Sequence, residues 1–156
     1  MEIAVVAVPG PPLEAVRSLF VEYAGSLGFS LCFQGFDEEL RALPGAYAPP
    51  RGILLLAMVD GQAAGCAGVR PLDESRCEIK RLYTRPQYRG SGLGRRLVEA
   101  ALAFARDAGY RQMLLDTLPQ MTAAQALYRS LGFRDCAAYY DNTPLASSCM
   151  VIGLPA

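Results

Sequence analysis

Residues 53–59 and 63–70 form two apolar runs that are separated by the dipeptide Asp60-Gly61. An Asp-Gly pair is typical of a two-residue β-turn, because the central positions of that turn need positive φ angles, which these two residues adopt easily. Apolar runs on either side of such a turn predict two antiparallel strands. We therefore expect a β-hairpin in the middle of the chain.

The apolar pattern of the remaining chain alternates between strand and helix periods. Further strands are predicted at 2–8, 77–84, 112–117, about 134–140 and 148–154. Helices are predicted from Pro11 to Gly28, at 36–43, from near Gly92 to Gly109 and at 121–131. This order predicts an α/β (mixed α+β) fold, with a mixed sheet flanked by helices in a single domain, residues 1–156.

The chain contains no histidine. This excludes Ser-His-Asp and Cys-His nucleophile systems, His-ligated metals and a His general base, because all of them need an imidazole. Any proton transfer must therefore use carboxylates, Tyr, Cys, Lys or water.

The five cysteines are scattered, odd in number and contain no C-x-x-C pair. Neither a disulfide framework nor a zinc site is indicated, and we expect a reduced, cytoplasmic setting. The chain begins Met1-Glu2 without a basic leader, and its longest apolar stretches are far shorter than a membrane-spanning helix. We expect no membrane partner.

The charges are unevenly distributed along a chain whose net charge is zero. Residues 1–60 carry three arginines and seven acidic residues, a net charge of −4. Residues 76–96 carry seven basic residues and one acid, Glu78, a net charge of +6. This basic segment predicts a site for a phosphorylated ligand or nucleic acid, and the alternative is a solvated charged face.

The stretch from Tyr88 to Arg96 places three glycines between a predicted strand and a predicted helix. Glycines let the backbone approach an anion closely, and the free N–H groups of a helix N-terminus point toward it. The stretch is not a dinucleotide-binding fingerprint, because Arg95 stands where a third glycine is required, and no Gly-Lys-Ser/Thr follows as in a Walker A loop. It predicts a phosphate-binding loop.

Two motifs resemble the GNAT-type N-acetyltransferase superfamily. Arg89, Gly92 and Gly94 match its R/Q-x-x-G-x-G/A loop, and residues 124–133 (AQALYRSLGF) match its A-x-x-L-Y-x-x-x-G-F signature. The resemblance implies a largely antiparallel sheet with about four helices, acetyl-CoA as cofactor, and a primary amine of a small molecule or peptide as acceptor, by direct transfer in a ternary complex. It also implies a possible homodimer.

The resemblance further implies the roles of individual residues. The CoA pyrophosphate would bind the backbone of Arg89, Gly90, Ser91, Gly92, Leu93, Gly94 and Arg95, and the pantetheine arm would lie along Leu82, Tyr83 and Thr84. Tyr128 would protonate the departing thiolate; its alternative role is to pack the last helix on the sheet. Met121 stands where many relatives have an Asn that contacts the cofactor.

The reaction also needs a base, because amines are protonated at neutral pH. Glu78 resembles the strand glutamate that some family members use, often through water. Its alternative is a structural ion pair with Arg76, Lys80 or Arg81, which would make it a poor base. Asp116 could instead face the substrate or cap the turn that follows its strand.

The resemblance places the acceptor against the first helices and the last strands. Aromatic and acidic residues there suit a cation, and we single out Phe33, Gln34, Glu38 and Tyr139 from a group that also contains Phe36, Glu39, Tyr140 and Asp141. The alternative is that these aromatics are core or interface residues and that the acids are solvated.

Two other functions stay open: a non-catalytic CoA-binding sensor, and nucleic-acid binding, which a neutral net charge disfavours.

Overall fold

The computed structural model describes residues 1–27, 35–139 and 148–155. Its strands are β1 (Glu2–Val5), β2 (Ile53–Val59), β3 (Gln62–Pro71), β4 (Arg76–Thr84), β5 (Gln112–Thr117), β6 (Arg134–Cys136) and β7 (Ser148–Gly153). Its helices are α1 (Pro11–Ser26), α2 (Phe36–Ala42), α3 (Leu93–Asp107) and α4 (Thr122–Ser130), with short 3-10 turns η2 (Gly45–Tyr47) and η3 (Pro86–Tyr88).

The strands form one seven-stranded sheet in the order β1-β2-β3-β4-β5-β7-β6. Every neighbouring pair is antiparallel except β4 and β5. The predicted fold class, a mixed and largely antiparallel sheet flanked by helices, is confirmed. In the described part of the chain the longest helix, α1, has 16 residues, and none is long and apolar enough to cross a bilayer.

The central hairpin forms as its sequence predicts. Asp60 and Gly61 both have positive φ angles, 50° and 76°, and join β2 to β3. This backbone twist matches the right-handed twist of the flanking strands, which is why such turns connect tight hairpins.

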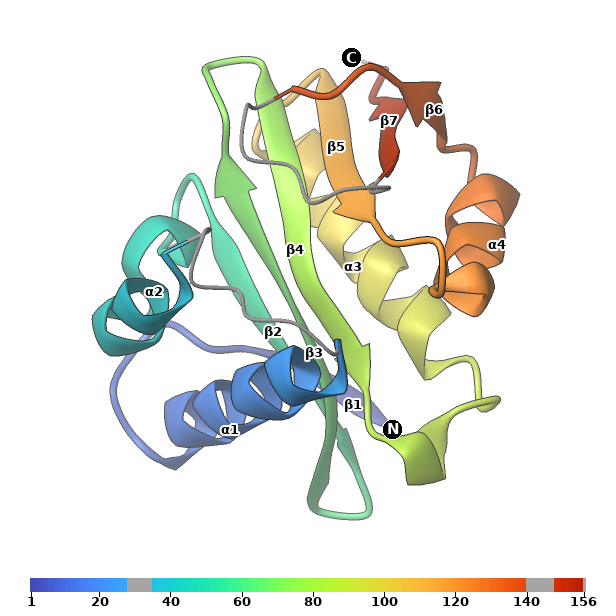
Figure 1. Ribbon diagram of the computed structural model, residues 1–156. Helices are drawn as coiled ribbons and strands as arrows, with labels where there is room; N and C mark the ends of the chain where they lie inside the picture. Colours follow the sequence, from blue (N-terminus) through green and yellow to red (C-terminus); the bar gives the residue numbers. More distant parts are fainter. Residues whose placement is uncertain (28–34, 140–147, 156) are drawn as a thin grey trace.

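Helices cover both faces of the sheet, with α1 and α2 on one face and α3 on the other (Figure 1). Along β2 the buried side chains alternate: Ile53 and Leu55 join the core under α3, and Leu54 and Leu56 join the core under α1 and α2. A strand buried on both faces has to be apolar throughout, which explains the continuous apolar run. We call the side under α1 and α2 the α1 face.

The sheet opens between β4 and β5. These parallel strands pair only from Arg76 opposite Gln112 to Glu78 opposite Leu114, and further along they diverge (Figure 1). On the other edge of β4, the register with β3 shifts at Arg81, whose φ angle is 61°. At this point β4 has one residue more than β3, which is a β-bulge. A bulge bends its strand, so the bulge at Arg81 accounts for the separation of β4 from β5.

Two predicted strands are shorter than expected. The strand predicted at 2–8 ends at Val5, because the chain leaves the sheet edge ahead of Pro9-Gly10 to begin α1. The strand predicted at 134–140 ends at Cys136, because the following stretch turns back over the sheet, where the Tyr139 hydroxyl meets Glu78 on β4.

Gly68 on β3 supplies the first testable prediction. A Cβ at this position would lie 2.6 Å from the ring of Tyr47, which is 1% exposed and cannot move away. Gly68→Ala should therefore lower the free energy of unfolding by about 1–3 kcal/mol in urea titrations. Gly25→Ala, on α1 with open space around it, is the matched control and should be neutral or slightly stabilising. Equal effects of the two changes would contradict the packing argument.

Candidate functional site

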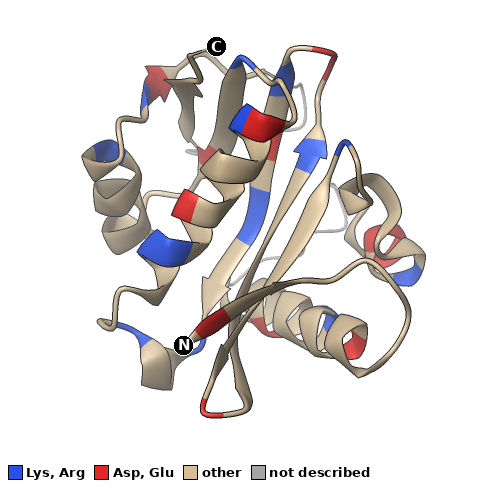
Figure 2. Cartoon of the chain, turned by 180° about the vertical axis from the view of Figure 1, so that it is seen from behind, with Lys and Arg blue, Asp and Glu red and all other residues tan. Residues whose placement is uncertain are grey.

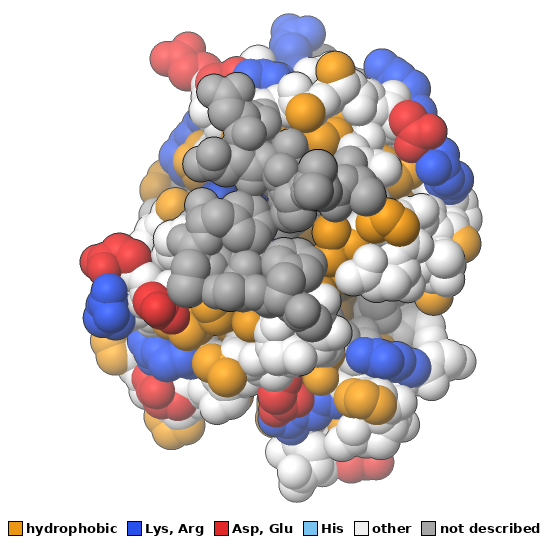
Figure 3. Space-filling view, viewed as in Figure 1, with side chains coloured by type: hydrophobic (Ala, Val, Ile, Leu, Met, Phe, Trp, Pro, Cys, Tyr) orange, Lys and Arg blue, Asp and Glu red, His pale blue; other side chains and the backbone are white. Residues whose placement is uncertain are grey.

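A groove of about 580 Å³ lies where the ends of α1 and β4 meet the beginnings of α3 and α4. In the space-filling view the surface is hollowed at this point (Figure 3). The residues that line it include Tyr23, Ser26, Leu27, Leu82, Tyr83, Thr84, Tyr88, Arg89, Gly90, Gly92, Leu93, Gly94, Arg95, Gln120, Met121, Thr122, Ala123, Ala124 and Leu127. The groove thus joins the predicted phosphate loop to the end of β4 and to α4.

The loop presents six consecutive backbone amides, from Gly90 to Arg95, that donate to no acceptor within the described residues. Gly90 and Gly92 both have a φ angle of 82°, a left-handed conformation that side chains disfavour. The first amide bonded into α3 is that of Arg96, which donates to the Gly92 carbonyl at 3.1 Å. Free donors at the positive end of a helix make an anion-binding site.

The basic segment does not form one free cationic surface. Its basic residues lie along β4, on the loop after it and at the start of α3 (Figure 2). Five of them are held in ion pairs: Arg76 with Asp73, Lys80 with Asp116, Arg81 with Glu39, Arg85 with Glu22 and, at the surface, Arg95 with Glu99 at 3.6 Å. The cations beside the groove are Arg89 and Arg95, both exposed.

Tyr128 lies one turn along α4 from the groove wall at Ala124 and next to Leu127. It is 7% exposed, its ring meets Phe133 edge-on at 5.6 Å, and its hydroxyl has no hydrogen-bond partner within the described residues. Burial, with smaller contributions from Tyr23 and Asp116, raises the pKa of Tyr128 above the usual phenol range. The phenol therefore keeps its proton at neutral pH.

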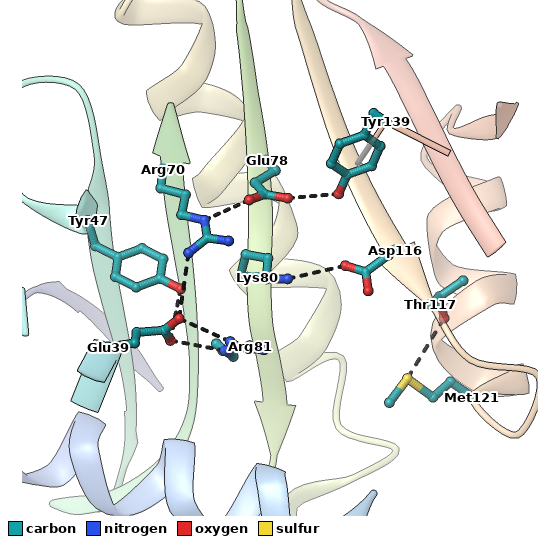
Figure 4. Close-up of polar contacts among 10 residues, drawn as sticks. All are labelled: Glu39, Tyr47, Arg70, Glu78, Lys80, Arg81, Asp116, Thr117, Met121 and Tyr139. Atoms are coloured by element: carbon teal, nitrogen blue, oxygen red, sulfur yellow. Dashed lines mark hydrogen bonds and ion pairs between the residues drawn. The ribbon is translucent and has the colours of Figure 1, made fainter. Parts of the chain in front are cut away.

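A network of charged side chains lies on the α1 face, beyond the groove (Figure 4). Arg81 donates twice to Glu39, with both distances 3.0 Å, and the Tyr47 hydroxyl donates to the same carboxylate at 3.1 Å. The Arg81 side chain is 2% exposed and that of Glu39 9%. A buried arginine needs such a counter-charge, so the pair ties α2 to β4.

Glu78 uses both of its carboxylate oxygens. Arg70 Nε donates to Oε1 at 2.6 Å, and the Tyr139 hydroxyl donates to Oε2 at 2.8 Å (Figure 4). The sequence suggested an ion pair with a neighbour on the same strand, but the partner is Arg70 on β3, because Arg70 and Glu78 are directly opposite in the antiparallel register. The Glu78 side chain is only 3% exposed.

Lys80 and Asp116 span the opening between β4 and β5. Each lies two residues beyond the last parallel pair of its strand, and Lys80 Nζ is 3.4 Å from Asp116 Oδ1. Burial lowers the pKa of Lys80, an effect that Asp116 opposes. No hydrogen bond in the described chain uses Asp116 Oδ2, which leaves this oxygen available to a ligand in the opening.

The model of the acetyltransferase (GNAT) family matches residues 14–133. The chain belongs to the GNAT acetyltransferase family. It is similar to an uncharacterized N-acetyltransferase of Schizosaccharomyces pombe, with 41% identity over 83% of this chain and 81% of the relative.

Two further relatives extend the comparison. An aminoglycoside N(6')-acetyltransferase of Stenotrophomonas maltophilia is 33% identical over 72% of this chain and 80% of its own length. The crystal structure of a GNAT acetyltransferase from Elizabethkingia anophelis with acetyl-CoA bound superposes with a TM-score of 0.69, 19% identity, and coverage of 98% of this chain and 97% of that chain. Family membership confirms the predicted acyltransferase class and its use of acetyl-CoA.

The structure brings most of the residues predicted for the GNAT cofactor site to one groove. Ser91 is absent from the groove lining, and its hydroxyl donates to the Tyr88 carbonyl at 2.6 Å. Met121 lines the groove and its sulfur accepts a hydrogen bond from the Thr117 hydroxyl at 3.8 Å. The side chain that replaces the family's Asn therefore faces β5 as well as the groove.

The residues predicted for the acceptor are not all in one place. Phe33 and Gln34, with Tyr140 and Asp141, lie outside the described residues. Glu38 is on the exposed side of α2, where it pairs with Arg41 at 2.6 Å, and its neighbour Glu39 points into the network. Tyr139 meets Glu78.

Sequence reasoning missed the contribution of α1 to the groove and the role of Arg70. Tyr23, Ser26 and Leu27 were assigned only to a helix, although the position of Tyr23 on the apolar side of α1 was correct. Arg70 was assigned only to a strand. The antiparallel pairing of β3 with β4 places Arg70 directly opposite Glu78, and this pairing could have predicted their ion pair.

Glu39 supplies the second testable prediction. Glu39→Gln removes the charge that compensates buried Arg81, so it should lower the free energy of unfolding by at least about 2 kcal/mol in denaturant titrations. The same change at the adjacent, exposed Glu38 should cost less than about 0.5 kcal/mol. A result in which Glu38→Gln is as harmful as Glu39→Gln would show that the buried pair does not hold α2 in place.

Proposed function

We propose that this chain transfers the acetyl group of acetyl-CoA to a primary amine of a small molecule or peptide, in a ternary complex. The observation that carries the proposal is the row of six unbonded amides, Gly90 to Arg95, at one end of a groove that runs to the end of β4. An acetyl-CoA-bound neighbour and an aminoglycoside-acetylating relative support the cofactor and a small-molecule amine.

Different residues of the groove would bind different parts of the cofactor. The amides from Gly90 to Arg95, with Arg89 beside them, would bind the pyrophosphate, because backbone donors and a helix N-terminus stabilise such an anion. The pantetheine arm would lie along Leu82, Tyr83 and Thr84, since β4 has no pairing partner on that edge once β5 has diverged. Acetyl-CoA then supplies the activated acyl group.

Tyr128 would act as the acid. When the amine attacks the carbonyl carbon, a C–N bond forms, the C–S bond breaks, and the departing thiolate needs a proton. A buried phenol with a raised pKa is protonated at neutral pH and can hydrogen-bond to that sulfur. Its hydroxyl has no other partner in the described structure that would compete for this contact.

The base is better assigned to Asp116 than to Glu78. Glu78 is buried and both of its oxygens are already bonded, whereas Asp116 has an unbonded oxygen and lies at the strand opening beside Lys80. We propose that Asp116 accepts the proton that the amine loses, directly or through water.

A CoA-binding sensor without turnover is the alternative function. It would use the same groove and differs only in releasing no free thiol when amines are added. A role in nucleic-acid binding is not proposed, because five of the seven basic residues of the 76–96 segment are held in ion pairs. The single-domain organisation of residues 1–156, the cytoplasmic location and the homodimer stay predictions.

Tyr128 supplies the third testable prediction. Tyr128→Phe keeps the ring that packs on Phe133 and removes the proton donor, so kcat for thiol release across an amine panel should fall at least about tenfold. The affinity for CoA, measured by calorimetry, should stay nearly unchanged. Unchanged turnover would remove Tyr128 from the mechanism, and thiol release absent in the wild type with every amine would favour the sensor.

The loop glycines supply the fourth testable prediction. Gly92→Ala places a side chain at a φ angle of 82° within the amide row and should weaken CoA binding at least about tenfold in calorimetry. Gly109→Ala introduces the same strain at the other end of α3, where φ is 88°, and should leave CoA affinity unchanged. Equal loss of affinity in both variants would mean that helix stability, not the loop, controls binding.

A further inference from the structure

Glu78 is buried and both of its carboxylate oxygens are hydrogen-bonded, whereas a general base needs an oxygen that can reach the amine. Its side chain is 3% exposed, Arg70 occupies one oxygen at 2.6 Å, and Tyr139 occupies the other at 2.8 Å. To accept a proton from an amine, the carboxylate would have to release one of these charge-assisted hydrogen bonds. Its contacts instead connect the middle of the sheet to a residue 61 positions further along the chain.

Tyr139 reaches across the sheet from its edge. The chain leaves β6 at Cys136, and three residues later the Tyr139 hydroxyl meets Glu78 on β4. Because β7 and β5 lie between β6 and β4 in the sheet, this contact crosses β5, the strand that carries Asp116 (Figure 4).

We propose that Glu78 is a positioning residue that holds Tyr139 over β5 and so sets the affinity for the acceptor amine. We call Arg70, Glu78 and Tyr139 the Tyr139 clasp. Arg70 fixes one oxygen of Glu78 at 2.6 Å, and the other oxygen accepts the hydrogen bond of Tyr139 at 2.8 Å. The inference rests on the proposed function, since the clasp acts on the amine that Asp116 deprotonates.

The clasp places an aromatic side chain beside the opening between β4 and β5. The cofactor groove approaches that opening from the end of β4, from Leu82 to Thr84. In the proposal the amine approaches from the opposite end, where Glu78 and Tyr139 lie. A tyrosine fixed by a carboxylate offers a pre-organised wall there, and pre-organisation lowers the entropic cost of binding. Loss of the clasp should therefore raise KM for the amine and spare the chemical step.

The test uses steady-state kinetics of the full chain with an amine that the wild type acetylates. Tyr139→Phe removes one charge-assisted hydrogen bond and should raise the amine KM about tenfold, with kcat within about threefold of wild type. Glu78→Gln should raise KM in the same direction, and the double variant should be no worse than the more harmful single change, because both act through one contact.

The pH profile separates a positioning role from a catalytic one. If Glu78 only holds Tyr139, Glu78→Gln keeps the acidic limb of the kcat profile, whereas Asp116→Asn loses it. A fall in kcat of about a hundredfold or more in Glu78→Gln, with loss of that limb, would overturn the proposal and make Glu78 the base. A wild type without turnover would instead disprove the proposed function.

A control variant and a measurement without catalysis complete the test. Tyr110→Phe removes a comparable hydrogen bond, 2.7 Å to the Arg51 carbonyl, outside the clasp and should leave the amine KM unchanged. Hydrogen–deuterium exchange of the peptide 134–139 should accelerate in Tyr139→Phe and Glu78→Gln but not in Tyr110→Phe. Exchange that is unchanged in all three variants would show that Glu78 does not hold this stretch.

Discussion

The loss of pairing between β4 and β5 is the constraint on which the rest of the site depends. The two parallel strands share hydrogen bonds only as far as Glu78 and Leu114, and the bulge at Arg81 bends β4 away beyond that point. The unpaired edge of β4 then becomes one wall of the groove, and the beginning of α3 becomes its anion-binding end. Without this divergence the backbone of Leu82 to Thr84 would be occupied by β5.

An opening in a sheet exposes polar backbone and charged side chains, so it has to be stabilised by other contacts. On the α1 face this is done by ion pairs that cross between elements: Arg81 with Glu39 of α2, Arg70 with Glu78, and Lys80 with Asp116 across the opening itself. Each cation has an acid within reach, so the charges of the network largely cancel. The groove end has the exposed arginines Arg89 and Arg95 beside the free amides, which suits a phosphorylated cofactor.

The local pattern of the sequence was sufficient for the order of the elements and for the place of the glycine loop before α3. The Asp60-Gly61 turn, the apolar period of α3 and the glycines before it are determined by residues close together in the chain, and all of them appear where the pattern placed them. The partners of Glu78 and the difference between Glu38 and Glu39 were not accessible in this way. They depend on strand register and on the rotation of α2, which involve residues tens of positions apart.

The sequence by itself determined the family and the position of the glycine loop to which we assign the phosphorylated cofactor, because both depend on short motifs with fixed spacing. Only the tertiary structure decided which carboxylate keeps an oxygen without a hydrogen-bond partner among the described residues. Glu78 and Asp116 are equivalent in a sequence, each being one acid on a predicted strand. Their environments differ because β3 brings Arg70 to Glu78, the stretch after β6 brings Tyr139, and the opening of the sheet leaves one oxygen of Asp116 unbonded.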